Sequence, residues 1–469
     1  MEDEGTEREE ATQKLRQWLE EVSNPSLNPW PDFVIPEEVE EDEHEDDPVI
    51  DPIADHGPDD DCSYKGKRDK DGNYHIYGTL TYPDGDIVNT EFNHGEKHGE
   101  AVVISPRRGL SRLVGTYVND HFEGKGKLVS DKVEISDCFF KRNRLHGPLR
   151  RFALKKFREF RQQLDFIGQY RRGRPHGLCW QYKEGGGFLV GVVDEKGGFT
   201  HPHAIAYIYP DLRTALLGHF EDGVMKSARH VKLIGVKVEP RTRLAHPEFS
   251  TPNPDSPAVH YSKATKTHIG DLPLVPDPYE ERHVEVRESD LPGSGDGLFA
   301  RRHLPAGTIA AFYNGVRLPY KLGGTKEEWA TSGYKIYVNA DYRSGERMDI
   351  PAEYIDLKNY CATFGHKLNH SFRPNCQEWF FEHPRFGLVP CERTLRDVEA
   401  GEELFLDYEY DPYNCPEWFS DQLIVFKRSM SDEEEAKLSI AYARFVVDPL
   451  PATASAAVEA ATAEAVSSS

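Results

Sequence analysis

Three features that would define a class of protein are missing from this 469-residue sequence. No stretch approaches the ~20 consecutive apolar residues that a membrane-spanning helix needs. The first ten residues, MEDEGTEREE, have neither the basic nor the apolar region of a signal peptide, so we expect an intracellular protein. The seven cysteines include no C-x-x-C pair, which argues against a disulfide framework and a cysteine-rich zinc site. Reduced thiols and no bound metal are expected.

Positive charge is scarce in one region only. Residues 1–61 carry 23 Asp and Glu against 3 Lys and Arg, whereas the rest of the chain is nearly neutral. We expect 1–61 to be an acidic, largely disordered arm, because like charges repel and little apolar surface can be buried. Binding of basic partners such as histones is the functional alternative. One helix is predicted within the arm, because four apolar residues share a helical face: Leu15, Trp18, Leu19 and Val22.

The next region, 62–228, contains a weak repeat. Each unit has an aromatic residue, a polar turn with Gly or Asn, and a second apolar alternation, spaced by about 23 to 30 residues. The clearest units begin at Glu91, Thr116, Cys138 and Gln169. Each unit predicts one antiparallel β-hairpin, and because a lone hairpin is marginal in water, the hairpins should stack.

Two segments interrupt or follow the repeat. The basic stretch 149–165, RRFALKKFREFRQQLDF, is interpreted as an extended hairpin with a solvated basic face, with binding of acidic lipid or nucleic acid as the alternative. Residues 229–281 are rich in proline and are expected to connect the repeats to a second domain.

A second, β-rich domain is predicted for 282–428, because short alternating segments are separated by Gly and Pro turns. Pro416, preceded by Asn414 or Cys415, should begin a closing helix that buries one apolar face. Ser431 and Glu434 form a capping box for a further helix over 429–448. The tail, 449–469, should be disordered. The fold class is therefore mainly β.

Four polar or glycine-containing motifs occur in this domain. They are GSGDGLF at 293–299, FYNGV at 312–316, GHKLNHSFRPN at 365–375 and EELFLDYEY at 402–410. Each is a weak signal alone, but in this order they resemble the SET domain, the fold of protein lysine methyltransferases. Together with the upstream hairpins, which resemble MORN repeats, the chain is similar to the MORN-repeat SET-domain histone-lysine methyltransferases.

The resemblance implies a methyl donor, S-adenosylmethionine, and a set of site residues. Methyl transfer to an amine needs close alignment of the donor and a deprotonated lysine. The implied catalytic residues are Tyr408, Tyr313 and Tyr410. The implied cofactor-binding residues are Ser294, Gly295, Asp296, Asn369, His370, Trp418 and Gln422. The substrate channel is expected to include Trp329, Ile336 and Glu378. For Trp418, a buried position in the core of the closing helix is the alternative.

The sequence departs from the family pattern at three positions. Glu378 stands where the family has a channel tyrosine, and a carboxylate there would favour the unreactive ammonium form of lysine. Our hypothesis is that Glu378 turns away and that Trp379 or a loop shift refills the wall. Tyr334 and Pro390 replace a cofactor-contacting asparagine and a lysine near the channel.

The expected substrate is a lysine in a histone tail or another nuclear protein. We expect a monomer without sequence-specific nucleic-acid binding, located in the nucleus or on chromosomes, with the cytoplasm as a second location. The alternative, from a different class, is a catalytically silent scaffold or binding module in which Glu378 has spoiled the channel.

Overall fold

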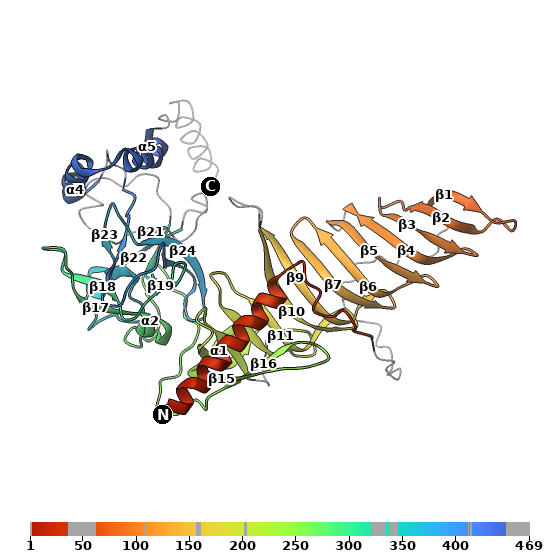
Figure 1. Cartoon of the computed structure of the whole chain (residues 1–469), viewed down its shortest axis with the longest axis horizontal. Helices are drawn as coiled ribbons and strands as arrows, with labels where there is room; N and C mark the ends of the chain where they lie inside the picture. Colours follow the sequence, from red (N-terminus) through yellow and green to blue (C-terminus); the bar gives the residue numbers. More distant parts are fainter. Residues whose placement is uncertain are drawn as a thin grey trace, which may run out of the picture. The chain divides into compact units, whose positions relative to one another are not determined.

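The computed structural model describes residues 2–35, 62–106, 109–155, 161–200, 204–319, 334, 336–337, 346–410, 412 and 415–446. The chain forms two compact units (Figure 1). Unit 1 comprises Met1–Ala264, His268–Arg282 and Phe380–Val389, and unit 2 comprises Thr265–Thr267, His283–Trp379 and Pro390–Ser469. Among the described residues, no helix is long and apolar enough to cross a membrane.

Unit 1 is built on one long antiparallel sheet, which Figure 1 shows as a row of hairpins in chain order. Its described strands are β1 (Ser63–Arg68), β2 (Tyr74–Thr81), β3 (Ile87–Asn93), β4 (Glu96–Ser105), β5 (Leu110–Val118), β6 (His121–Ser130), β7 (Val133–Lys141), β8 (Arg144–Leu145), β9 (Gly147–Lys155), β10 (Arg161–Arg171), β11 (Arg174–Tyr182), β12 (Phe188–Val192), β13 (Ile205–Ile208), β14 (Thr214–Glu221), β15 (Val224–Val238) and β16 (Ala245–Phe249). The short β8 pairs with β7 outside the main order.

The predicted hairpins are confirmed, and their turns share one geometry. Five two-residue hairpin loops have positive φ at both residues, the pattern of a type I′ turn, whose twist matches that of the flanking strands. They are His94–Gly95, Asn119–Asp120, Arg142–Asn143, Arg172–Gly173 and Asp222–Gly223. The stretch 149–165 is also a hairpin, since β9 pairs with β10. Residues 156–160 at its tip lie outside the described residues.

Helix α1 (Glu2–Ser23) packs on the sheet of unit 1, as Figure 1 shows in red. The predicted apolar face is confirmed: its four residues are at most 9% exposed. The indole of Trp18 donates a hydrogen bond to the carbonyl of Arg243 at 2.7 Å, and the indole of Trp30 donates to that of Thr242. For residues 2–35 the structure therefore differs from a disordered arm, because the helix buries its apolar face on distant strands. Residues 36–61 lie outside the described residues.

Arg150 on β9 holds the C-terminal end of α1. Its guanidinium is fully buried, pairs with Asp137 at 2.7 Å, and donates to the carbonyls of Val22 and Asn24 at 3.0 and 2.8 Å. It also donates to the carbonyl of Leu27. These carbonyls lie where a helix end lacks internal donors. The predicted basic face of 149–165 is thus not solvated at Arg150.

The sheet continues past the expected boundary at residue 228. That position falls inside β15, and β16 follows it, so the expected connecting region extends the sheet instead of leaving it. Helix α2 (Pro278–His283) follows and is capped by Asp277, whose Oδ1 accepts from the N–H groups of Tyr279 and Glu280 at 2.9 and 3.3 Å. The other oxygen of Asp277, Oδ2, accepts from the hydroxyl of Tyr209 at 2.6 Å and contacts Nε2 of His383 at 3.1 Å.

Unit 2 contains three small sheets in its described part. Their strand orders are β17-β18-β26-β23, β19-β25-β24 and β20-β22-β21. The strands are β17 (Val284–Glu288), β18 (Asp296–Ala300), β19 (Ile309–Phe312), β20 (Val316–Pro319), β21 (Ile336–Tyr337), β22 (Glu346–Asp349), β23 (Asn369–His370), β24 (Cys376–His383), β25 (Gly387–Thr394) and β26 (Glu403–Leu406). The far ends of β24 and β25, Phe380–Val389, belong to unit 1.

Short 3₁₀ turns and two helices complete the described part of unit 2. The turns are η3 (Ala352–Tyr354) and η4 (Gly365–Lys367), and the helices are α4 (Glu417–Ser429) and α5 (Asp432–Val446). The predicted apolar face of α4 is confirmed, since Phe419, Leu423 and Phe426 are buried. The capping box is confirmed as well, because Ser431 N–H donates to Glu434 at 2.7 Å and Glu434 N–H donates to Ser431 Oγ at 3.3 Å. The predicted tail lies outside the described residues.

Candidate active site

The polar stretch GHKLNHSFRPN passes between the other motifs of unit 2. Its strand β23 pairs in parallel with β26, which places Asn369 opposite Phe405 and His370 opposite Leu406. Gly365 lies so close to FYNGV that a Cβ there would meet the carbonyl oxygen of Phe312 at 2.6 Å. Only glycine fits this close approach without displacing backbone.

Buried Glu403 ties the glycine motif to the polar stretch. Its Oε1 accepts from Asn369 Nδ2 at 3.1 Å and from Ser289 Oγ at 2.7 Å, and its Oε2 accepts from the N–H of Asp290 at 3.0 Å. Asn369 Nδ2 also contacts the carbonyl of Asp296 at 3.1 Å. These bonds explain how motifs more than one hundred residues apart in the sequence meet at one site.

The predicted residues of the glycine motif are exposed at this site. Gly295 has a φ of +72°, and a Cβ there would meet no atom within 4 Å. The carboxylate of Asp296 pairs with Lys367 at 2.6 Å, and the Lys367 side chain is only 6% exposed. Ser294 is exposed beside them. The turn therefore offers open backbone next to a fixed ion pair.

His370 is buried with one ring nitrogen unsatisfied. Nδ1 accepts a hydrogen bond from the N–H of Tyr408 at 3.2 Å, whereas Nε2 has no partner among the described residues. Burial lowers the pKa of His370 to about 4, so the ring is neutral and its proton lies on Nε2. Aromatic rings surround it, with Phe372 at 4.4 Å and Phe419 at 4.8 Å between centroids. A buried N–H donor without an acceptor suits a ligand that brings an acceptor.

The three predicted catalytic tyrosines come together in the described part of unit 2. Tyr408 donates to the carbonyl of Leu368 at 2.6 Å, and Tyr313 donates to that of Tyr334 at 2.5 Å. The rings of Tyr408 and Tyr410 are 5.7 Å apart. Burial raises the pKa of Tyr410 to about 12 and the pKa values of Tyr408 and Tyr313 further, so all three hydroxyls stay protonated near neutral pH.

Helix α4 places Trp418 at the edge of this cluster. Its ring lies 5.9 Å from that of His370 and 6.1 Å from that of Tyr410, and its side chain is 42% exposed. The alternative of a buried core residue is therefore wrong, because the neighbouring Phe419 takes the core position. Gln422, one turn further, is exposed.

The hypothesis for Glu378 needs correction. Trp379 does not refill the wall: it is 43% exposed and lies under the guanidinium of Arg393, 5.4 Å from the ring centre. Because neighbouring strand residues face opposite sides, Glu378 points to the other side of β24 and is half-buried there. Burial, followed by the charge of Glu409, raises the pKa of Glu378 to about 8. Its carboxyl is thus largely neutral at pH 7.

The remaining predicted positions are less informative. Ile336 is half-buried on β21, and Trp329 lies outside the described residues. Tyr334 and Pro390, the two further departures, each offer a carbonyl to Tyr313: one to its hydroxyl and one to its backbone N–H at 2.8 Å. Sequence reasoning missed Glu392 on β25. Its only signal was one acidic residue within the apolar segment GLVPCERTL.

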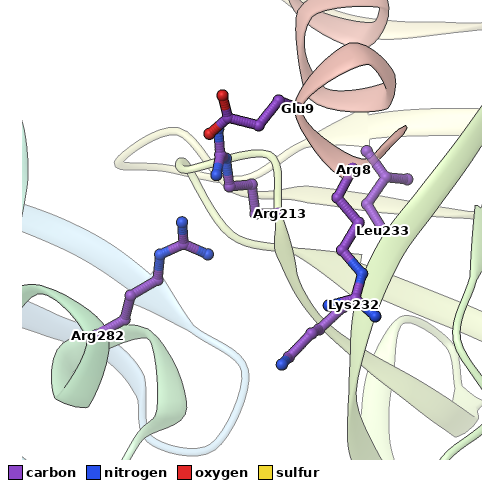
Figure 2. Close-up of a pocket in the computed structure, with 6 residues that line it drawn as sticks. All are labelled: Arg8, Glu9, Arg213, Lys232, Leu233 and Arg282. Carbon is purple, nitrogen blue, oxygen red and sulfur yellow. The ribbon is translucent and has the colours of Figure 1, made fainter. Parts of the chain in front are cut away.

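A separate cavity lies in unit 1 and contains none of the predicted residues. Figure 2 shows the residues that line it, which are mainly basic. The cavity has a volume of about 260 Å³. The lining residues are Arg8, Glu9, Arg213, Lys232, Leu233 and Arg282. Glu9 already pairs with Arg213 at 2.8 Å, which joins α1 to the loop before β14. The described residues hold no cluster of three or more metal-ligating side chains, and the expected absence of a metal stays a prediction.

Comparison with known proteins agrees with this geometry. Residues 295–409 match the SET domain family, and residues 170–243 match the family described as the N-terminal region of the histone H3 K4-specific methyltransferase SET7. The fold and site thus define a SET-domain methyltransferase. The sequence is 40% identical over 273 residues to histone-lysine N-methyltransferase SETD7 from Halocynthia roretzi, covering 56% of this chain and 68% of that protein. The chain belongs to the SETD7 family, as the motifs predicted.

Solved structures of polycomb repressive complex 2 are more distant. A chain of the active complex in its basal state is 22% identical with a TM-score of 0.22, covering 28% of this chain and 16% of that one. A chain of an autoinhibited complex bound to S-adenosylmethionine is 18% identical with a TM-score of 0.21. The match covers 31% of this chain and 17% of that one. Likenesses this weak carry no argument about the present chain.

Proposed function

We propose that this chain transfers a methyl group from S-adenosylmethionine to a lysine side chain of a histone or another nuclear protein, acting in the nucleus. Membership of the SETD7 family gives the reaction class. The observation that supports this site is the buried Nε2–H of His370, which has no acceptor among the described residues although four motifs converge on it. A bound cofactor would supply that acceptor.

The residues around His370 fit the cofactor. In this family the bound sulfonium supplies an electrophilic methyl group. The open backbone of Ser294–Asp296 and the side chain of Asn369 would bind its polar atoms. Trp418, which is exposed beside His370, and Gln422, which is exposed one turn further along α4, would cover one face of it. We assign no metal to this site.

The tyrosines would receive the lysine. Tyr408, Tyr313 and Tyr410 offer apolar ring walls to an aliphatic stem, and their neutral hydroxyls offer lone pairs to an amine. Ile336 and Trp329 are assigned to the substrate channel, as the resemblance to the family implies. Tyr408 is the central residue of this proposal, because it contacts both the Leu368 carbonyl and, through its N–H, the ring of His370. We also assign a monomer without sequence-specific nucleic-acid binding.

The test is transfer of tritium from methyl-labelled S-adenosylmethionine to mixed core histones. Tyr408→Phe should lower incorporation by about 100-fold, because it removes one positioned hydroxyl, while cofactor binding is retained. Tyr77→Phe is the matched control: Tyr77 is 56% exposed on the sheet of unit 1 and should leave the rate unchanged. Equal labelling by wild type and Tyr408→Phe would refute the assigned role. No labelling by either, with cofactor still bound, would favour the silent binding module.

A further inference from the structure

Glu392, on β25, lacks, among the described residues, the hydrogen-bond partners that buried carboxyl groups usually have. Its side chain is 0% exposed, and neither carboxyl oxygen has a hydrogen-bond partner among the described residues. Buried polar groups are nearly always paired, and an unpaired carboxyl destabilises the fold. Its presence therefore needs an explanation other than stability.

Glu378 lies across from Glu392 on the neighbouring strand. β24 and β25 are adjacent in their sheet, and the N–H of Leu395 donates to the carbonyl of Asn375 at 2.8 Å. Asn375 therefore faces Leu395. Three residues further along β24 is Glu378, and three residues earlier on β25 is Glu392, so an antiparallel pairing places these two opposite each other. Residues that face each other in this way have Cβ atoms about 4.5–5.5 Å apart. The two carboxyl groups thus form a pair on the side of β24 opposite to Trp379.

The pair borders the tyrosine cluster. Strand β19 pairs with β25 through Phe312 and Cys391, so Tyr313, which follows β19, lies beside the strand that carries Glu392. The electrostatic effect agrees with this position, because a charge on Glu392 contributes to raising the pKa values of both Tyr313 and Tyr408.

Two carboxyl groups in one apolar site cannot both ionise, so they retain a proton between them. Burial raises the pKa of Glu392, as does the charge of Glu378, and Glu409 contributes to the raised pKa of Glu378. The titratable groups that the described elements bring to the pair are the carboxyl of Glu409, the thiol of Cys376 and the hydroxyls of two tyrosines. These tyrosines are Tyr313 and Tyr408.

We propose that the Glu378–Glu392 pair accepts the proton that the substrate ammonium must lose before methyl transfer. This inference rests on the proposed lysine methylation. The singly ionised form of the pair, whose share grows as the pH approaches 8, takes a proton from the ε-ammonium and becomes neutral, leaving a neutral amine. The amine lone pair then forms the bond to the methyl carbon as the carbon–sulfur bond breaks. Its electrons return to sulfur, which becomes a neutral thioether, and the nitrogen becomes a methylated ammonium.

A pair of carboxyl groups avoids the problem that a single carboxylate at position 378 would cause, which is a lysine held in its unreactive ammonium form. A permanently ionised carboxylate would hold the lysine as an ammonium, whereas a base with a pKa near the working pH takes the proton and later releases it to solvent. General bases tuned in this way contribute about 10²–10⁴-fold to a rate. Glu378 is assigned as the residue that touches the substrate, and fully buried Glu392, opposite it on β25, as the second carboxyl of the pair.

The first experiment measures single-turnover methyl transfer to mixed core histones between pH 6 and pH 10. Glu378→Gln should reduce the rate at pH 7 by about 100-fold, and the loss should shrink as the pH rises and the lysine deprotonates in solution. Cofactor affinity should not change. The matched control is Glu382→Gln, the same chemical change on the same strand at a side chain paired with Lys183 and 44% exposed. It should leave the profile unchanged.

Two outcomes separate the pair from the wider proposal. If wild type methylates histones and Glu378→Gln shows the same rate and pH profile, the proton-acceptor role is wrong although the methyltransferase assignment stands. If wild type labels no histone, the proposed function fails. The pair is then tested by ¹³C NMR of the full chain labelled at glutamate carboxyl carbons. The signal lost in Glu378→Gln should titrate near pH 8 in wild type and at lower pH in Glu409→Gln, because the charge of Glu409 contributes to the raised pKa of Glu378. A signal that titrates with ordinary glutamates in wild type would overturn the pair.

Discussion

Two regions of the molecule bury a carboxyl group completely and treat it in opposite ways. Around Asp277, in unit 1, burial would raise the pKa, but hydrogen bonds from His383 and Tyr209 and the charge of Arg385 hold it below its ordinary value. The N–H of Arg385 donates to Nδ1 of His383 at 3.1 Å, so this histidine is neutral and donates from Nε2 to Asp277. Around Glu392, in unit 2, no described group donates to the carboxyl.

The difference distinguishes a structural carboxylate from a reactive one. Asp277 is ionised because its donors replace water, and it fixes the start of α2. Glu392 is protonated or shares a proton because no group in the described part of the chain replaces water around it. Strand β24 contributes to both regions, with His383 in one and Glu378 in the other. Asp277 thus stabilises the fold, whereas Glu392 is assigned to the reaction.

The largest expected effect is the loss of the satisfied carboxylate. Asp277→Ala should lower the free energy of unfolding by about 3–5 kcal/mol, because Tyr209 and His383 would keep buried donors without an acceptor and α2 would lose its cap. Urea unfolding measures this change. Asp255→Ala, at an exposed loop position, is the control and should change little. A loss no larger than that of the control would contradict the structural role of Asp277.

Removing the unsatisfied carboxyl of Glu392 is expected to stabilise the fold, opposite to the effect of removing Asp277. Glu392→Leu should raise the free energy of unfolding by about 1–3 kcal/mol, because it removes a buried polar group without breaking a hydrogen bond. The same variant should lose methyl transfer. Destabilisation comparable to that of Asp277→Ala would show that Glu392 has a stabilising partner and would remove the distinction.

A smaller, pH-dependent effect is expected for Glu378. Its pKa rises from an ordinary value of 4.5 to about 8 in the folded protein. Between these values the folded state binds the extra proton, so the free energy of unfolding should fall as the pH rises and level off above about 8. Wild type should therefore lose about 1 kcal/mol more than Glu378→Gln between pH 6 and pH 8, since the half-buried site is partly screened. Parallel curves for the two proteins would contradict the raised pKa.

The smallest effect is expected at a carboxyl that water screens. Glu434 pairs with Arg373 at 2.6 Å on the surface of unit 2. Arg373→Ala should leave the melting temperature within experimental error, because exposed ion pairs contribute little. A clear loss would mean that exposure does not separate strong from weak carboxyl sites in this chain.

The sequence was sufficient where the signal is local or shared by a motif. It predicted the stacked hairpins, the apolar faces of α1 and α4, the capping box at Ser431 and the residues that meet around His370. The sequence could not predict that α1 packs on the sheet, because the contact joins Trp18 to Arg243 and no local sequence pattern indicates it. It also could not distinguish Glu378 turned inward from Glu378 turned outward, because alternation in β24 is irregular. Glu392 belonged to no motif, and only burial without a partner made it conspicuous.

The anchoring of Trp18 to Arg243 has a consequence for biosynthesis. The two residues are separated by 225 positions. At about 5–20 residues per second, the ribosome needs roughly ten to fifty seconds to synthesise the segment between them. Until β15 and β16 have been made, the docking site for the apolar face of α1 is incomplete. The first helix of the chain to be made must therefore wait for its docking site, and it becomes one of the last parts of unit 1 to reach its final place.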